Sequence, residues 1–363
     1  MTPLAPGEPA PWFTCRTRRN EHYAFDTVAG RHVVLCFFGS AAHPAAARVL
    51  SEVARHRSRF DDRDVCFFGV SVDPEDETGE RVSDAIPGIR YFWDFDRSVS
   101  ALYGAARGND VYQPLTYLLD PALRILAVLP VCAAGEGHVP ALLELLDRLP
   151  AIPPPHPAAA QAPVLVLPRV FEPELCRALV NHYIARGGED SGFMRDIGGK
   201  TVPIIEYGHK RRRDCAIADE ELRRACAVRI YHRVVPETEK AFQFRATRME
   251  RYILACYDSA EGGHFRPHRD NTTKGTAHRR FAVSLFLNTG EYTGGYLRFP
   301  EFGSALYTAP VGGAVVFSCS LLHEATAVTR GRRYMFLPFL YDEAARRIRE
   351  ENSRFLESGR RDV

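Results

Sequence analysis

The first 150 residues alternate between short apolar runs and longer segments of helical period. The apolar runs are rich in β-branched and aromatic residues, as strands buried on both faces are. Strands that alternate with helices predict an α/β domain built around a mainly parallel sheet. The predicted strands are Val33–Phe38, Val65–Val72, Leu115–Leu119 and Ile125–Val131, and the predicted helices are Ala45–Phe60 and Pro140–Leu149.

The second half of the chain has a different pattern. Helical segments come first, at Glu172–Arg186 and at Asp219–Phe242 with a break near Pro236. From Arg248 onward, short apolar runs are separated by Gly, Pro and Asn, which is typical of a β-sandwich or barrel. We therefore expect an all-β core with helices packed outside it. The predicted strands are Arg251–Cys256, Phe281–Leu287, Tyr296–Phe299, Ala314–Phe317 and Arg333–Leu340.

A proline-rich segment separates these two patterns. Residues 150–163 contain six prolines and no charged side chain. Proline cannot donate the hydrogen bonds of a helix or an inner strand, so this composition favours an extended linker. The predicted domains are residues 1–149 and 164–363, with residues 150–163 as the linker between them.

Composition narrows the classes of function. The 363 residues carry 47 Lys and Arg against 45 Asp and Glu, and the charge is uneven: about −5 over residues 1–150 and +7 over the rest. That excess is too small for a nucleic-acid surface, although it suits anionic small molecules. The nine cysteines are scattered without a CxxC pair, so we expect no zinc cluster and a reducing, cytoplasmic location. No apolar run is long enough for a membrane span, and no membrane partner is expected.

Three residues of the second half have the chemistry of an iron site. His268 and Asp270 are two residues apart, so on an extended strand both project from the same face. His323 follows another apolar strand and supplies a third ligand. Two His and one carboxylate form the facial triad of non-heme Fe(II) oxygenases, which leaves positions open for reactants. An isolated HxD is common by chance and more often structural, but Arg333 lies ten residues after His323, and its guanidinium suits a carboxylate.

These residues resemble the Fe(II)/2-oxoglutarate dioxygenases of the prolyl-4-hydroxylase type. The resemblance covers residues 248–342 and includes the stretches GGHFRPHRD (262–270), GGYLRFPEFG (294–303) and PVGGAVVF (310–317). It implies a double-stranded β-helix, or jelly roll, with flanking helices. It also implies His268, Asp270 and His323 as the catalytic iron ligands, and Arg333 and Tyr257 as the residues that hold 2-oxoglutarate. Phe265 and Ala282 stand where family members usually have Tyr and often have Thr, although Ser284 could face the same way.

The resemblance implies hydroxylation of a C–H bond with Fe(II), 2-oxoglutarate and O₂, releasing succinate and CO₂, with ascorbate as a further candidate cofactor. The substrate stays open between a peptidyl residue and a free amino acid or similar metabolite. Asn271 and Arg280 follow the HxD and could line the pocket entrance, or belong to an ordinary turn. The polar segment Gly187–Asp214 is either a lid or, more simply, a solvated basic loop.

The first domain is similar to thioredoxin-fold proteins of the peroxiredoxin type. The similar pieces lie between residues 5 and 135 and include the entry GEPAPWF (7–13) and the strand VVLCFF (33–38). Active relatives carry a reactive Cys at the helix start after that strand, but here the turn GSAAHPAA (39–46) has none. We therefore expect a non-catalytic domain used for docking, homodimerisation or support. The alternative is a redox or docking module in which this domain carries the function of the chain. Cys15 and Cys132 lie outside that turn and could be reactive.

Overall fold

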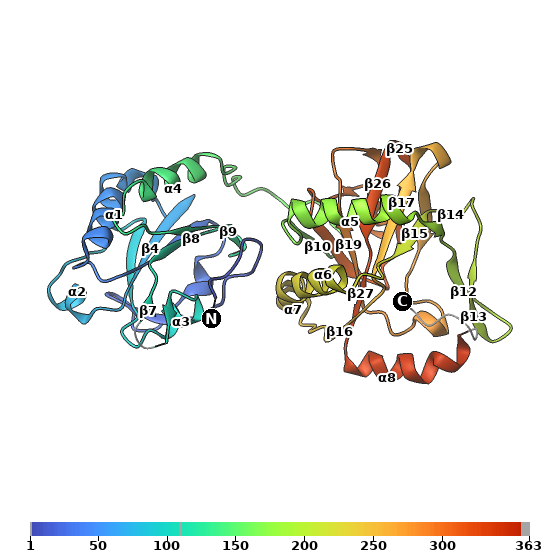
Figure 1. Ribbon diagram of the computed structural model, residues 1–363, viewed down its shortest axis with the longest axis horizontal. Coiled ribbons are helices and arrows are strands. Elements are labelled where there is room, and N and C mark those ends of the chain that lie inside the picture. The colour runs from blue at the N-terminus through green and yellow to red at the C-terminus, as the bar shows by residue number, and fades with distance from the viewer. Residues whose placement is uncertain (1, 109–110, 357–363) are drawn as a thin grey trace. The chain divides into compact units, whose positions relative to one another are not determined.

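The computed structural model describes residues 2–108 and 111–356. The chain forms two compact units, Met1–His156 and Pro157–Val363, so the division lies within the proline-rich segment 150–163. Over the described residues, no helix is both long enough and apolar enough to cross a membrane. Each unit has its own hydrophobic core and its own set of helices and strands (Figure 1).

The first unit contains one seven-stranded sheet in the order β2-β1-β5-β4-β3-β8-β9. Only β3–β4 and β4–β5 pair in parallel, so the prediction of a mainly parallel sheet was wrong. The turn at Asp120 explains one antiparallel pair: Asp120 accepts hydrogen bonds from the backbone N–H groups of Ala122 and Arg124, and the tight turn that results joins β8 and β9 as a hairpin. The antiparallel pairs β1–β5 and β3–β8 join strands that are far apart in the chain. The strands are β1 (Thr14–Thr17), β2 (Tyr23–Ala24), β3 (His32–Gly39), β4 (Val65–Ser71), β5 (Ile89–Trp93), β8 (Leu115–Leu119) and β9 (Ile125–Pro130).

Both faces of this sheet are covered, which explains the continuous apolar run of β3. Its even-numbered residues pack with α1 (Pro44–Arg55) and α4 (His138–Asp147), whereas the odd-numbered ones pack with Phe25, Phe92 and Val99. The unit also contains α2 (Pro74–Thr78), α3 (Ser98–Leu102), β6 (Ala106–Arg107) and β7 (Val111–Tyr112).

The second unit is a jelly roll covered by helices on one side, as predicted. Its large sheet runs β10-β23-β19-β26-β17-β15-β11, with β27 paired to β19 and to β16. The smaller sheet runs β14-β18-β24-β21-β22. The large-sheet strands are β10 (Val164–Leu167), β11 (Glu189–Asp190), β15 (Arg213–Ala216), β16 (Arg248–Glu250), β17 (Ile253–Asp258), β19 (Phe281–Phe286), β23 (Ala314–Ser318), β26 (Arg332–Phe336) and β27 (Phe339–Tyr341). Those of the small sheet are β14 (Lys210–Arg211), β18 (His264–His268), β21 (Leu297–Arg298), β22 (Leu306–Tyr307) and β24 (His323–Ala325).

Side chains of the large sheet alternate between two cores. Tyr257, Phe286 and Met335 meet Phe265 and Leu297 of the small sheet. The residues of opposite parity pack under three helices, α5 (Pro173–Arg186), α6 (Glu220–Arg233) and α7 (Val235–Phe242), which cover the outer face of the large sheet (Figure 1). The unit also contains the helix α8 (Glu343–Asn352) and the short pair β20 (Thr293–Gly294) and β25 (Val328–Arg330).

The polar segment Gly187–Asp214 forms regular secondary structure. It contains a hairpin of β12 (Phe193–Ile197) and β13 (Lys200–Ile204), which turns at Gly198 and Gly199, both with positive φ. A Gly-Gly pair between two short runs is a signal for such a two-residue turn. The hairpin is anchored to the loop after the HxD, because the backbone N–H of Gly275 donates to the Thr201 hydroxyl at 2.9 Å.

We expect elastase to cleave the chain first at Ala158–Ala160, because these small side chains are exposed and the flanking units are compact. Mass spectrometry should show two fragments that resist further digestion. Replacing Ala158, Ala159 and Ala160 with Asp should suppress this cut. First cleavage inside either unit would contradict two independently compact domains.

Candidate metal centre

Two strands of the small sheet bring the two histidines of the predicted triad together. His268 ends β18 and His323 begins β24, and the two residues face one another in the register of this antiparallel pair. Asp270 lies in the turn after β18, not on the strand as predicted, and its backbone N–H donates to the Cys319 carbonyl at 3.0 Å. That bond turns the carboxylate back toward the histidines. One ligand atom from each of the three residues lies within 4.8 Å of the others.

The imidazole rings are held with their Nε2 atoms toward Asp270. His268 Nδ1 lies 2.8 Å from the Arg266 carbonyl, and His323 Nδ1 lies 3.0 Å from the Leu321 carbonyl. Each Nδ1 therefore carries the proton and each Nε2 is free for a metal. The Nε2 atoms of His268 and His323 lie 3.6 and 3.4 Å from the Asp270 carboxylate oxygens. Two neutral nitrogens and one carboxylate on one side of a cavity suit Fe(II).

Burial, and then the neighbouring His323, hold the pKa of His268 well below its usual range. A histidine binds metal as the neutral imidazole, which has one protonated and one free nitrogen. The low pKa therefore favours the form that binds metal. Phe265 contributes to the burial, since its ring stacks on His268 with centroids 3.4 Å apart. The residue that stands where relatives usually have Tyr thus shields a ligand.

The triad opens into a cavity of about 1480 Å³ inside the jelly roll. Tyr257, Ser284 and Arg333 lie on its wall, as do Thr272 and Arg279. Such a volume exceeds that of an ordinary small-molecule pocket and can hold a co-substrate together with a second molecule.

The two residues predicted at the entrance do not line this cavity. Asn271 and Arg280 are absent from its wall, whereas the neighbouring Thr272 and Arg279 are part of it. Arg280 Nη1 donates to the Ala277 carbonyl at 3.0 Å, which closes the local turn. The ordinary-turn alternative describes the observed contacts of Arg280.

Arg333 is a buried cation on the cavity wall. It lies on β26 directly opposite Tyr257 of β17, and it is 1% exposed. Its Nε finds no hydrogen-bond partner among the described residues, and its guanidinium lies 5.0 and 5.1 Å from the ring centres of Tyr257 and Phe286. Gly295 makes this position accessible, because a Cβ there would meet Arg333 Cδ at 2.7 Å. An arginine stays charged, so such a site calls for an anion.

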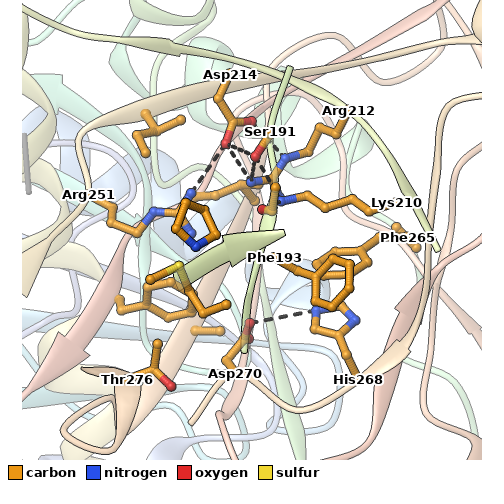
Figure 2. A pocket seen from close by; sticks show the side chains of 18 of the residues that line it. Ser191, Phe193, Lys210, Arg212, Asp214, Arg251, Phe265, His268, Asp270 and Thr276 are labelled. Atoms are coloured by element: carbon orange, nitrogen blue, oxygen red, sulfur yellow. Dashed lines mark hydrogen bonds and ion pairs between the residues drawn. The ribbon is translucent and has the colours of Figure 1, made fainter. Parts of the chain in front are cut away.

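Sequence reasoning missed a second basic group on the same wall. Lys210 and Arg212 are buried rather than solvated, and they lie with Asp214 and Arg251 around Ser191, as Figure 2 shows. A signal was present: the polar residues 210, 212 and 214 have strand spacing and so share one face. The solvated-loop interpretation was therefore wrong for these side chains.

Two family models match the chain. Residues 6–128 match the AhpC/TSA family, and residues 252–341 match the 2OG-Fe(II) oxygenase superfamily. The chain therefore has an AhpC/TSA domain followed by a 2OG-Fe(II) oxygenase domain. Both resemblances inferred from the sequence are confirmed, and the second match includes all three triad residues and Arg333.

The chain is similar to a PKHD-type hydroxylase of Pseudomonas fluorescens (strain Pf0-1). The two are 34% identical over 112 residues, which make up 29% of this chain and 47% of that protein. The chain thus spans about half the length of this curated relative.

Solved structures match each domain at lower identity. A Pseudomonas putida prolyl-4-hydroxylase matches with 18% identity and a TM-score of 0.38, covering 51% of this chain and 95% of that one. A Trichoplax adhaerens prolyl hydroxylase, in complex with a peptide fragment of the hypoxia inducible factor oxygen degradation domain, matches with 14% identity and a TM-score of 0.41, covering 51% and 86%. Mycobacterium bovis AhpC matches with 19% identity and a TM-score of 0.34, covering 40% and 98%.

The turn before α1 in the AhpC/TSA domain contains no thiol and is bound by two carboxylates. The Ser40 hydroxyl donates to Asp73 Oδ2 at 2.6 Å, and the backbone N–H of Ala41 donates to Asp76 Oδ2 at 2.9 Å. Asp76 is fully buried and also accepts from Ser71. Side chains of the same domain thus hold this turn in place.

The cysteines of the chain are buried, with one exception. Burial raises the pKa of the thiols of Cys15 and Cys66 to about 12 and that of Cys36 to about 11. Cys132 is exposed. None of the nine forms a disulfide in the structure, which describes all of them.

We expect Ellman's reagent to modify one thiol rapidly in the folded protein and nine after denaturation. The thiolate is the reacting form, and burial raises the pKa of the eight thiols other than that of Cys132. The Cys132→Ser variant should show no rapid phase. Rapid modification of any thiol in that variant would contradict the burial of the other eight cysteines.

We expect the protein to bind one equivalent of Fe(II) under anaerobic conditions, measured by equilibrium dialysis and mass spectrometry of the metal. Asp270→Ala and His323→Ala should each weaken binding by at least ~10-fold, since even partners of metal ligands have effects of this size. His264→Ala is the matched control on β18, because its ring nitrogens contact backbone carbonyls instead. Equal loss in all three variants would contradict a site at the triad.

Proposed function

We propose that the chain is an Fe(II)- and 2-oxoglutarate-dependent dioxygenase that hydroxylates a C–H bond and releases succinate and CO₂. The observation that carries the proposal is the placement of a two-His, one-Asp triad on the wall of one cavity together with Arg333, whose Nε has no hydrogen-bond partner among the described residues. The matched superfamily model and the PKHD-type relative support the same reaction class.

Each residue of the site has a distinct proposed task. His268, Asp270 and His323 would hold Fe(II), which supplies the activation of O₂ when it is bound. Arg333 would bind the distal carboxylate of 2-oxoglutarate through its guanidinium fork. The Tyr257 hydroxyl would contribute a further hydrogen bond to that carboxylate. Phe265 and the surrounding apolar side chains would keep water away from the ligands.

The substrate would be a peptidyl residue or an amino-acid-like molecule. Two observations support this class: the cavity has room beside the co-substrate, and one similar structure holds a peptide fragment. Ascorbate, which reduces iron, is a further proposed cofactor. A cytoplasmic location is proposed because the nine thiols of the structure are unpaired.

The AhpC/TSA domain would serve docking or homodimerisation and not peroxide reduction. The absence of a thiol from residues 39–46, together with the carboxylates that bind Ser40 and Ala41 in the turn before α1, supports this role. The extents of the domains, 1–149 and 164–363 with the linker 150–163, belong to the same proposal. A thioredoxin-fold module beside the oxygenase would bring a protein substrate to the cavity.

We expect Fe(II)-dependent conversion of 2-oxoglutarate to succinate that is absent from the His268→Ala variant. Arg333→Met should raise the KM for 2-oxoglutarate by roughly 30-fold, since losing a charge-assisted pair costs about 2 kcal/mol. Succinate is measured by mass spectrometry. Arg330→Met, three residues before Arg333 at the exposed end of β25, is the matched control.

Unchanged succinate formation in His268→Ala would overturn the proposed function. Peroxide-dependent thiol oxidation that survives removal of all iron would instead favour the redox module. A screen of peptides and amino acids for a gain of one oxygen atom identifies the substrate.

A further inference from the structure

A cluster of basic side chains faces the cavity apart from Arg333. Lys210 and Arg212 are 5% and 7% exposed, and Arg251 joins them from the turn between β16 and β17. Asp214 and Ser191 lie among these three side chains. Figure 2 shows the group at one side of the cavity, with His268 and Asp270 at the other.

Asp214 balances only one of the three positive charges. Arg212 donates to both of its carboxylate oxygens, from Nε at 2.7 Å and from Nη2 at 2.6 Å. Arg251 makes one hydrogen bond, from Nη2 to Asp214 Oδ2 at 3.3 Å. Arg279 nearby is already paired with Glu250 at 2.7 Å. When all three cations are charged, the cluster therefore carries two positive charges that Asp214 does not balance.

Lys210 has uncharged partners. Its Nζ donates to the Ser191 hydroxyl at 2.8 Å and to the Gly192 carbonyl at 2.6 Å, which leaves one of its three N–H groups without a recorded acceptor among the described residues. The same Nζ lies 4.8 Å from the ring centre of Phe265, which stacks on His268. The ammonium group is thus one aromatic ring away from the metal ligands.

The electrostatics of the cluster favour an anion. Burial, and next the charge of Arg212, hold the pKa of Lys210 well below its usual range. The same two causes lower the pKa of Arg251 to about 10. Burial opposes the ionisation of Asp214. The three cations Arg212, Lys210 and Arg251 nevertheless hold the pKa of this carboxyl below its usual range. A second anion would relieve the remaining repulsion among the cations.

We propose that Lys210, Arg212 and Arg251 form a subsite for a carboxylate of the molecule that is hydroxylated. The inference rests on the proposed function, because 2-oxoglutarate accounts for one anion only: its distal carboxylate would lie at Arg333 and its other end at the metal. The Tyr257 ring contacts both basic regions, with Arg333 at 5.0 Å and Arg212 at 5.8 Å from its centre. The cavity thus has one basic region for the distal carboxylate of 2-oxoglutarate and a separate one for the carboxylate of the substrate.

The proposed substrate is therefore an acid and not a neutral molecule. The carboxylate can belong to a free amino-acid-like metabolite or to the C-terminus of a peptide. Both sources present the same planar anion to the two arginines and the ammonium group.

The subsite can be tested by binding, without turnover. Full-length protein is loaded with Mn(II) and with N-oxalylglycine, an unreactive analogue that occupies the 2-oxoglutarate position, and is then titrated calorimetrically with glutarate. We expect a second anion to bind in the wild type, and expect Lys210→Met and Arg251→Met to weaken it at least ~10-fold. Both variants should bind N-oxalylglycine normally, whereas Arg333→Met should lose N-oxalylglycine and keep glutarate.

Matched controls isolate the charge. Arg211→Met removes a neighbouring cation that contacts Tyr207 and lies outside the cavity wall, so glutarate binding should not change. Glutaramide, the neutral diamide, should not bind. Arg251→Lys should recover part of the affinity lost in Arg251→Met, which separates charge from folding.

The inference is overturned if loaded wild-type protein binds no glutarate, if glutaramide binds equally well, or if the two Met variants bind glutarate like the wild type. Acetyl-trialanine and its C-terminal amide distinguish the sources: tighter binding of the peptide acid than of glutarate indicates a peptide terminus, and the reverse indicates a small free acid. Glutarate binding through Lys210 in a protein that forms no succinate would support the subsite while overturning the proposed function.

Discussion

The pairing of β18 with β24 is the constraint on which the site depends. Because these strands come from distant parts of the oxygenase domain, only their register places His268 opposite His323. Asp270 completes the triad through a backbone hydrogen bond to Cys319, which precedes β24. One antiparallel pair therefore supplies two ligands and anchors the third, so the precision of the metal site is that of a sheet and not of a loop.

Charge organises the rest of the cavity. Over the part of the chain that the structure describes, the Nε of the buried Arg333 has no hydrogen-bond partner, and Asp214 cannot neutralise Lys210 and Arg251 in addition to Arg212. Folding stability alone would favour pairing or removing such charges. These charges on a cavity wall are understandable if anions enter the cavity. The co-substrate and the proposed acid substrate would both supply such anions.

The two domains differ in whether they contain the side chains that the chemistry of the matched family requires. In the oxygenase domain, the residues of the triad have the contacts that metal ligands need. In the AhpC/TSA domain, β3 and α1 frame a turn that contains no cysteine, and Asp73 and Asp76 accept hydrogen bonds from Ser40 and Ala41 in that turn. A fold depends on its core residues, whereas chemistry depends on the particular side chains of a site.

Local residue patterns predicted an α/β first domain and an all-β core in the second, and the family resemblances implied the thioredoxin-like and jelly-roll folds. Ligand chemistry also singled out the triad and Arg333, which the structure places on the wall of one cavity. Apolar periodicity and ligand chemistry are properties of short segments, so they can be read without the fold. The mixed sheet, the turn that carries Asp270, and the burial of Lys210 and Arg212 could not be predicted in this way. Strand pairing and solvent exposure depend on contacts between residues far apart in the chain, and only the tertiary structure decided them.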